Sequence, residues 1–181
     1  FAQPREWSEA RSLDWFVLDN PLNQGVQRWV KALNNLYNAN DALYANDSDV
    51  MGFEWIDCDH PDKGVVSFIR RGSTPSKQLL FICNFVPVEY DNYEVGAPCF
   101  TTYKEVLNSD DVQFGGAGRL NSGKIKAIDK KTERMPYSIS VTVPPLSTVV
   151  LEYDYTDVTP EDILKKKEAE KKAAAAKRAA A

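Results

Sequence analysis

The first fifteen residues place indole side chains among charged ones. Arg5 and Glu6 precede Trp7, and Asp14 precedes Trp15. An indole face covers the apolar C–H face of a sugar ring, while carboxylates and guanidinium groups bond its hydroxyls. Arg5, Glu6, Trp7, Asp14 and Trp15 are therefore candidate sugar ligands. Packing of the two indoles in a core explains the same pattern equally well.

Two pairs of neighbouring carboxylates are the other candidates for acid–base chemistry, Asp57 with Asp59 and Asp110 with Asp111. Cleavage of a glycosidic bond needs two carboxyl groups on opposite sides of the scissile bond, held by rigid elements. Both pairs lie in turn-like stretches, where aspartates usually cap the backbone or stay solvated. We expect structural roles for them and no catalytic residue within this chain.

Residues for metal, cofactor and nucleophile chemistry are sparse. His60 is the only histidine of the sequence, so neither a serine–histidine relay nor a multi-histidine metal site can be built. Cys58, Cys83 and Cys99 show no CxxC spacing, and their odd number favours reduced thiols in a cytosolic protein. The glycine-rich run at 115–118 lacks a following Lys-Ser/Thr pair, which favours a hairpin over a phosphate loop. We expect no metal and no cofactor.

One strongly amphipathic helix follows the aromatic segment, over about 23–38. Asn20 is a suitable cap and Pro21 suits the first turn, so the helix begins between Pro21 and Asn23. Its apolar residues share one wide stripe: Leu22, Val26, Trp29, Val30, Leu33, Leu36 and Tyr37. Such a stripe requires a larger body to pack on, which is a following domain, a separate one, or both.

Short strands separated by turn residues make up the rest of the globular sequence. We expect strands at 53–57, 65–71, 79–85, 93–95, 102–107, 125–128, 137–143 and 148–155. Their number, and the absence of long helices between them, predict an antiparallel β-sandwich of seven or eight strands. The apolar run at 79–83 does not alternate, so we expect that strand to be central and covered on both faces.

Charge is distributed unevenly along the chain. Residues 161–181 carry seven Lys/Arg and four Asp/Glu, which leaves residues 1–160 with a net charge of −7. An acidic body gives no electrostatic footprint for nucleic acid, and no apolar run approaches the roughly 20 residues that cross a bilayer. The Lys/Ala-rich end predicts a solvated, partly helical tail without a docking face. The start at Phe1, without Met or a signal peptide, suggests a piece of a longer polypeptide.

The sequence resembles the C-terminal part of glycogen and starch branching enzymes, which belong to the α-amylase superfamily, glycoside hydrolase family 13. The resemblance runs in order over residues 1–154. Segments similar to the end of the catalytic domain are Phe1-Ala2-Gln3, Arg5-Glu6-Trp7, Ser12-Leu13-Asp14-Trp15, Gly25-Val26-Gln27-Arg28 and Leu33-Asn34. Segments similar to the C-terminal β domain include Phe53-Glu54-Trp55-Ile56, Cys83-Asn84-Phe85-Val86-Pro87-Val88, Glu105-Val106-Leu107-Asn108 and Ser138-Ile139-Ser140-Val141.

The resemblance implies a mainly β fold: an α-amylase-type C-terminal sandwich preceded by the last loop and last helix of a (β/α)₈ barrel. Residues 1–48 would close the barrel, 49–155 would form the sandwich and 156–181 the charged tail. Loops at the carboxyl ends of barrel strands build the active site. The resemblance thus supports Arg5, Glu6, Trp7, Asp14 and Trp15 as substrate-side residues.

The family's reaction cleaves an α-1,4 link in an α-glucan and re-forms it as α-1,6, using carboxylates on earlier barrel strands. The implied partners are an α-glucan and an upstream catalytic barrel, in the cytoplasm, with no nucleic acid and no membrane. By this interpretation the chain is inactive alone. The alternative is a non-catalytic β-sandwich module that binds carbohydrate or serves only as structure.

Overall fold

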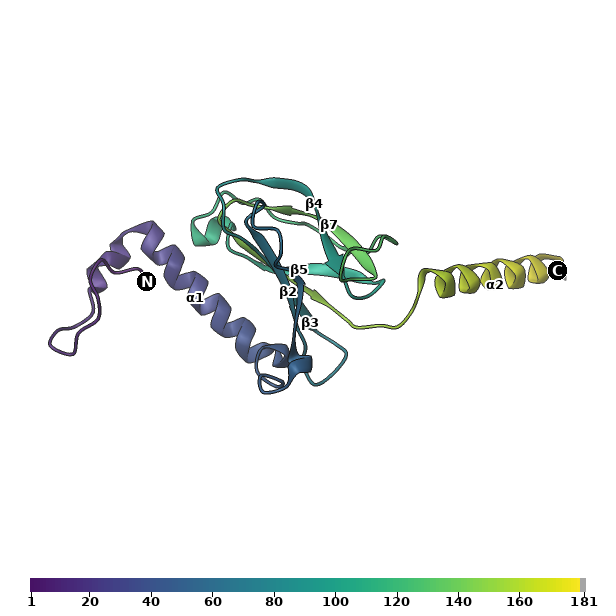
Figure 1. The fold of residues 1–181 in the computed structure, drawn as a ribbon, viewed down its shortest axis with the longest axis horizontal. Helices are drawn as coiled ribbons and strands as arrows, with labels where there is room; N and C mark the ends of the chain where they lie inside the picture. Colours follow the sequence, from purple (N-terminus) through teal and green to yellow (C-terminus); the bar gives the residue numbers. More distant parts are fainter. Residues whose placement is uncertain (180–181) are drawn as a thin grey trace.

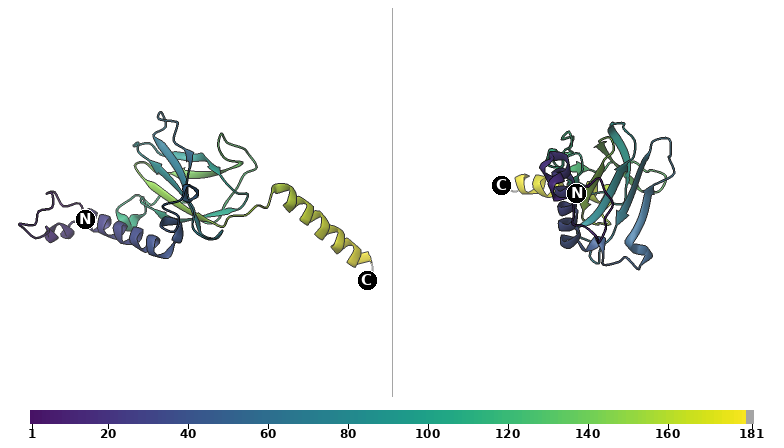
Figure 2. Two further views of the ribbon diagram at one scale, coloured as in Figure 1. Left: turned by 60° about the horizontal axis from the view of Figure 1, so that its bottom comes forward. Right: turned by 90° about the vertical axis from the view of Figure 1, so that its left-hand side faces the viewer.

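The computed structural model describes residues 1–179 and consists of a β-sandwich with one helix packed along it and a second helix projecting from it (Figures 1 and 2). The α-helices are α1 (Pro21–Ala39) and α2 (Pro160–Ala179). The strands are β1 (Phe53–Asp57), β2 (Val65–Arg70), β3 (Gln78–Asn84), β4 (Tyr90–Ala97), β5 (Thr102–Asn108), β6 (Ile125–Lys126), β7 (Tyr137–Val143) and β8 (Thr148–Tyr153). Short 3₁₀ helices connect them: η1 (Trp15–Asp19), η2 (Asp41–Leu43), η3 (Val50–Gly52) and η4 (Val112–Phe114).

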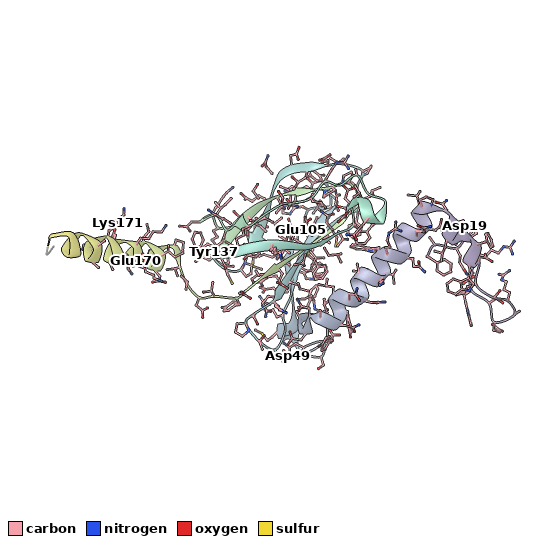
Figure 3. The ribbon with its side chains drawn as sticks, turned by 180° about the vertical axis from the view of Figure 1, so that it is seen from behind. Asp19, Asp49, Glu105, Tyr137, Glu170 and Lys171 are labelled. Atoms are coloured by element: carbon pink, nitrogen blue, oxygen red, sulfur yellow. The ribbon has the colours of Figure 1, made fainter. Side chains whose placement is uncertain are left out.

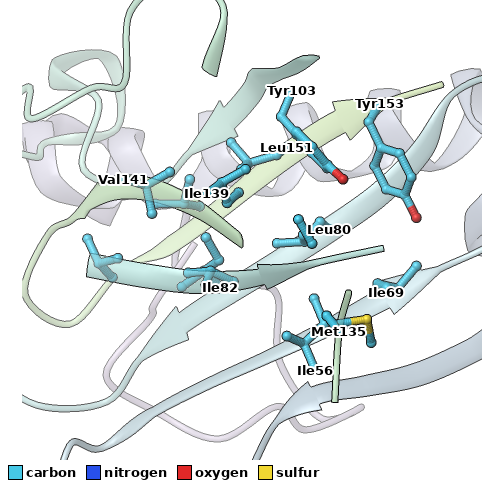
Figure 4. Close-up of a cluster of buried hydrophobic side chains, with 14 of the residues drawn as sticks. Ile56, Ile69, Leu80, Ile82, Tyr103, Met135, Ile139, Val141, Leu151 and Tyr153 are labelled. Atoms are coloured by element: carbon cyan, nitrogen blue, oxygen red, sulfur yellow. The ribbon is translucent and has the colours of Figure 1, made fainter. Parts of the chain in front are cut away.

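All strand pairs are antiparallel. Six strands form one sheet in the order β1-β2-β3-β8-β5-β6, and β4 pairs with β7 in a second sheet. The sandwich expected from the sequence is confirmed, and β3 lies centrally between β2 and β8 as predicted. Apolar side chains from both sheets meet in the core, among them Ile82, Tyr103, Ile139 and Leu151, each fully buried (Figure 4).

Three strands differ from their expected bounds by two residues or more, and one of them, β8, ends at Tyr153 rather than at 155. The fourth strand extends over Tyr90–Ala97 rather than 93–95, because a bulge between Tyr90 and Tyr93 absorbs the polar Asp91 and Asn92. Asn92 takes a left-handed φ of 53°, which a short polar side chain tolerates. The sixth strand ends at Lys126 rather than at 128. Ile128 does not continue the pairing with β5 and forms a bridge with Ser138 of β7. The chain changes sheets at this point.

Helix α1 begins where the capping residues predict. The Asn20 side chain accepts a hydrogen bond from the backbone N–H of Leu22 at 2.9 Å, and Pro21 occupies the first turn. One row of residues faces the sandwich: Gly25 is buried, and Trp29, Ala32 and Leu36 are partly buried. Leu36 packs against a cluster on the outer face of the six-stranded sheet, formed by Ala42, Leu79 and Val150 with their partly buried neighbours. The sandwich therefore takes part of the apolar stripe.

A glycine allows the closest approach of α1 to the sandwich. A Cβ added at Gly25 would lie 2.2 Å from the carbonyl oxygen of Phe114 in η4. The Trp29 and Phe114 rings meet edge to face, with centroids 5.1 Å apart. Both contacts would be lost if α1 moved away from η4. The absence of a side chain at Gly25 therefore sets the position of α1.

Helix α2 packs no face on the sandwich over residues 160–174, whose side chains the structure describes. Thr159 and Asp162 cap it reciprocally: the Asp162 carboxylate accepts from the Thr159 N–H at 3.0 Å, and Thr159 Oγ1 accepts from the Asp162 N–H at 3.2 Å. Its side chains described up to residue 174 are largely exposed, and Glu170 and Lys171 lie far from Glu105 and Tyr137 of the sandwich (Figure 3). The tail is thus more regularly helical than expected, and Ala180 and Ala181 lie outside the described residues. Neither α1 nor α2 combines the length and hydropathy needed to cross a membrane.

We predict that Gly25→Ala destabilises the chain by about 1–3 kcal/mol, because the new methyl group must displace α1 from η4. Alanine normally stabilises a helix relative to glycine by about 1 kcal/mol, so the sign itself is diagnostic. Urea unfolding followed by circular dichroism measures the change. Asn34→Ala, on an exposed position of the same helix, is the control and is expected to be neutral or slightly stabilising. An equal or greater stability of Gly25→Ala would contradict the packing described.

Candidate functional site

The aromatic segment 1–20 forms an arm that folds back on the first turns of α1. The Asn23 side-chain amide donates to the carbonyl oxygens of Phe1 and Ala2 at 2.9 and 3.0 Å. Gln24 donates to the carbonyl oxygen of Leu18 at 2.8 Å. The arm extends beyond the sandwich at the end of the molecule opposite α2 (Figure 1). Its position thus depends on α1 rather than on the β-sheets.

Gln3 links the two halves of the arm, a role that sequence reasoning missed. Its amide nitrogen donates to the carbonyl oxygen of Arg5 at 2.9 Å, and its amide oxygen accepts from the backbone N–H of Asp14 at 3.3 Å. The two candidate segments are therefore joined through one glutamine. The sequence signal was a side chain able to donate and accept at once, two residues before the first candidate group.

The aromatic side chains of the arm are largely uncovered. Trp7 is 69% exposed, Trp15 57% and Phe16 69%. Trp15 stacks on Phe1 with ring centroids 5.1 Å apart, so one face of this indole has a neighbour. Large apolar groups gathered in one exposed segment indicate a contact surface for another molecule or domain. Within this chain the arm's indoles do not pack into a core.

The charged candidates of the arm have no ionic partners within the described chain. Arg5 and Glu6 are exposed and Asp14 is partly buried, and none of them takes part in the ion pairs of residues 1–179. The Asp14 carboxylate does not cap η1, although Asp14 occupies the capping position. These groups keep their hydrogen-bonding capacity for a ligand.

The carboxylate pairs elsewhere have structural partners. Asp59 forms an ion pair with Arg134, and Asp57 pairs with His60. Asp111 caps η4 through the N–H of Gln113 at 3.0 Å.

Asp110 closes the glycine-rich loop at 115–118. It accepts from the backbone N–H groups of Ala117 and Arg119 at 3.2 and 3.0 Å. Gly115 and Gly118 take φ values of 94° and 80°, which only glycine adopts freely. The run lies in the connection between the antiparallel pair β5 and β6, and Asp110 closes it as a loop. Turn and cap roles account for both carboxylate pairs.

No cluster of three metal-ligating side chains occurs in the part of the chain that the structure describes. The three cysteines are free in the structure. Burial raises the pKa of the Cys83 and Cys99 thiols, so both remain protonated near neutral pH.

The second candidate surface is the uncovered flank of α1, formed by Leu22, Val26, Val30 and Tyr37. Their exposed fractions are 64%, 37%, 45% and 47%. They form the row next to the one that packs on the sandwich. Two loop residues are also exposed, Phe85 at 68% and Leu146 at 67%, and line a hollow together with Trp29. An exposed row of apolar side chains on a helix is typical of a surface that contacts another molecule or domain.

The fold places the protein in a structural class: an antiparallel two-sheet sandwich preceded by an amphipathic helix that the sandwich covers only in part. The family profile of the alpha amylase C-terminal all-beta domain matches residues 55–154. The chain belongs to this family. The match covers β1 to β8 almost completely and excludes the arm, α1 and α2.

The chain is similar to bacterial proteins named 1,4-alpha-glucan branching enzyme GlgB. That of Oceanobacillus iheyensis is 39% identical over 153 residues, which are 84% of this chain and 24% of the relative. That of Hydrogenovibrio crunogenus is 44% identical over 151 residues, 83% of this chain and 20% of the relative. That of Gloeobacter violaceus is 41% identical over 150 residues, again 83% and 20%. The chain thus spans a fifth to a quarter of the length of these relatives.

The His60–Asp57 pair generates a pH-dependent prediction. His60 Nδ1 lies 2.8 Å from Asp57 Oδ1. The hydrogen bond to Asp57, and then its charge, raise the pKa of His60 above 6.5, with Lys63 opposing and Glu133 assisting. Because the folded-state pKa is raised, this stabilising contribution is complete below the ordinary histidine value and disappears as pH rises through the raised one. We predict that Asp57→Asn lowers the pKa of His60 toward its ordinary value, as measured by NMR titration of the imidazole protons.

Asp59→Asn is the matched control, because Asp59 pairs with Arg134 instead of His60. It removes the same charge from the same turn and is expected to move the His60 pKa much less. Equal titration curves for Asp57→Asn and the unmodified chain would contradict the pairing.

Proposed function

We propose that the chain is the C-terminal portion of a 1,4-α-glucan branching enzyme and works together with an upstream catalytic (β/α)₈ barrel. The similarity to proteins of that name, over 82–84% of the chain, supports this proposal. So does the share of those relatives that the chain spans, 20–24%, which leaves most of their length for other parts. The reaction would move α-1,4-glucan segments to α-1,6 positions, in the cytoplasm.

The uncovered flank of α1 is the observation that carries this proposal. Burying each half-exposed apolar side chain stabilises an association by on the order of 1 kcal/mol. Leu22, Val26, Val30 and Tyr37 lie on one continuous row, with Phe85 and Leu146 exposed nearby. A barrel that precedes α1 in the same polypeptide would reach this row without a linker. In this arrangement α1 is shared, with one row on the sandwich and the next on the barrel.

The domain division follows from this sharing. Residues 1–48 would complete the barrel, 49–155 form the sandwich, and 156–181 extend away as the tail. The sandwich would hold α1 in place through Gly25 and Leu36, and α1 would in turn place the arm.

The arm would supply substrate contacts rather than bond-breaking groups. Trp7 and Trp15 offer ring faces for glucosyl units, while Arg5, Glu6 and Asp14 offer donors and acceptors for hydroxyls. The nucleophile and the acid/base carboxyl group would come from the barrel, because the carboxylate pairs Asp57/Asp59 and Asp110/Asp111 have cap, turn and ion-pair roles. The chain alone would bind or position glucan without cleaving it.

A second candidate function is a carbohydrate-binding sandwich that acts without a barrel. The exposure of Trp7 and Trp15 favours it, because stand-alone sugar-binding surfaces also present uncovered aromatic rings. The half-bare stripe of α1 favours the first proposal, since a neutral sugar does not require a helix row of Leu, Val and Tyr.

We predict that the chain restores branching to the Hydrogenovibrio crunogenus relative from which the matching 151 residues have been removed. The iodine-stain shift of amylose and the count of new α-1,6 links measure the activity. Val30→Lys is expected to weaken the association at least about tenfold, roughly 1.4 kcal/mol, because it places an unpaired charge in an apolar contact. Asn35→Lys adds the same charge to an exposed position outside the flank and is the matched control.

Trp7→Ala separates the arm from the docking surface in the same assay. It is expected to leave the association unchanged while lowering kcat/KM for amylose about tenfold, because it removes a substrate contact only. Unchanged kinetics of Trp7→Ala would contradict the role of the arm. Branching by the chain without any partner, or equal association of Val30→Lys and Asn35→Lys, would contradict the proposed arrangement.

A further inference from the structure

A pocket of about 540 Å³ opens at one end of the sandwich, where β1 begins and β2 ends. Its walls include Phe53, Glu54, Arg71, Thr74 and Tyr155. No lining residue belongs to the arm or to α1, so the pocket is separate from both surfaces described above. Its volume falls within the roughly 300–1,000 Å³ of small-ligand sites.

Two partly exposed rings form the apolar walls. Phe53 is 38% exposed and is held in an aromatic cluster, with its ring centroid 4.9 Å from that of Trp55 and 5.2 Å from that of Phe68. Tyr155 is 43% exposed and anchored at both ends: its backbone N–H donates to Pro75 at 2.7 Å and its hydroxyl donates to Asp157 at 2.8 Å. Both rings are fixed before any ligand arrives, which reduces the entropy lost on binding.

The charges of the side chains that line the pocket cancel one another. Glu54 and Arg71 are its only ionic side chains, and they form an ion pair with each other. A pocket of zero net charge offers nothing to a phosphate or a metal cation. The pair still presents carboxylate acceptors beside guanidinium donors, which suits a neutral molecule with many hydroxyl groups.

A buried hydroxyl behind this pair has no partner. Tyr153 is 2% exposed, and its hydroxyl makes no hydrogen bond within the described chain. Burial raises the pKa of Tyr153; the positive charge of Arg71 opposes this shift, and the negative charge of Glu54 adds to it. Tyr153 lies at the border of the core cluster and pairs in register with Gln78, a pocket-lining residue (Figure 4). An unsatisfied buried polar group costs free energy, so the Tyr153 hydroxyl requires an explanation, such as a partner from outside the chain.

We propose that this pocket binds a short stretch of a neutral α-glucan chain, with a glucosyl ring against Phe53 and Tyr155 and hydroxyls bonded to Glu54 and Arg71. The choice of α-glucan rests on the proposed function; the neutral, hydroxyl-rich character of the ligand follows from the lining itself. The pocket holds a glucan chain at the sandwich, away from the arm.

NMR titration of the chain with maltotriose tests this site directly. The four tryptophans give four indole N–H signals, assigned by single Trp→Phe variants. Trp55 touches the Phe53 wall, whereas Trp7 and Trp15 report on the arm. We expect the Trp55 indole and the backbone amides of 72–74 and 76–78 to shift with a Kd near 1 mM, about −4 kcal/mol. Cellotriose, with β-1,4 links, is expected to shift them much less.

Tyr155→Ala and Tyr155→Phe form the matched pair of variants. Tyr155→Ala removes the ring wall and is expected to weaken binding about tenfold, whereas Tyr155→Phe keeps the ring and is expected to bind nearly as the unmodified chain does. Trp7→Ala is expected to leave the Trp55 shifts unchanged. No shift at Trp55 up to about 10 mM maltotriose, or equal shifts in the Tyr155→Ala chain, would overturn the proposal.

The titration and the branching assay fail independently. If the chain restores branching but the Trp55 signal does not shift, the proposed glucan site in the pocket is refuted and the proposed function stands. If maltotriose shifts the Trp55 signal but the chain neither associates with a barrel nor restores branching, the glucan site stands and the proposed function is refuted. Shifts confined to Trp7 and Trp15 would assign sugar binding to the arm alone.

Discussion

The contact between Gly25 of α1 and the Phe114 carbonyl oxygen determines where the arm and the uncovered flank of α1 lie. A helix that carried a larger residue at this position would stand off from η4 and lose the edge-to-face contact between Trp29 and Phe114. The arm is bonded to α1 through Asn23 and Gln24, so a displaced helix displaces the arm as well. The sandwich thus acts as a rigid base that fixes one row of α1 and leaves the adjacent row free.

The division of the α1 stripe into two rows explains how one helix can join two bodies. The row with Trp29 and Leu36 is packed on the sandwich, and the row with Val26 and Val30 is bare. A helix buried on both rows transmits the position of one domain to the other without a flexible linker. In the proposed enzyme this coupling would keep the arm in register with the barrel, so that the sandwich would affect substrate contacts made by the arm.

Much of the fold could be predicted from the sequence because local signals agreed with one another. Turn residues separated the strands, the Asn20-Pro21 pair set the start of α1, and the unbroken apolar run at 79–83 identified the central strand. The division of the α1 stripe could not be predicted, since periodicity shows which residues are apolar and not which body covers them. The 540 Å³ pocket was missed for another reason: residues 53–54, 71 and 155 are distant in sequence and meet only when β1, β2 and β8 are placed together.

Native-state hydrogen exchange of α1 tests most directly whether this helix is shared between two bodies. With half of its stripe bare, α1 is expected to open locally, so that the Val30 and Leu33 amides exchange faster than those of Leu80 and Ile82 in β3. Adding the truncated Hydrogenovibrio crunogenus relative is expected to slow the α1 amides and leave those of β3 unchanged. Exchange of α1 as slow as that of β3 in the chain alone, with no response to the added partner, would show that the sandwich alone accounts for this helix.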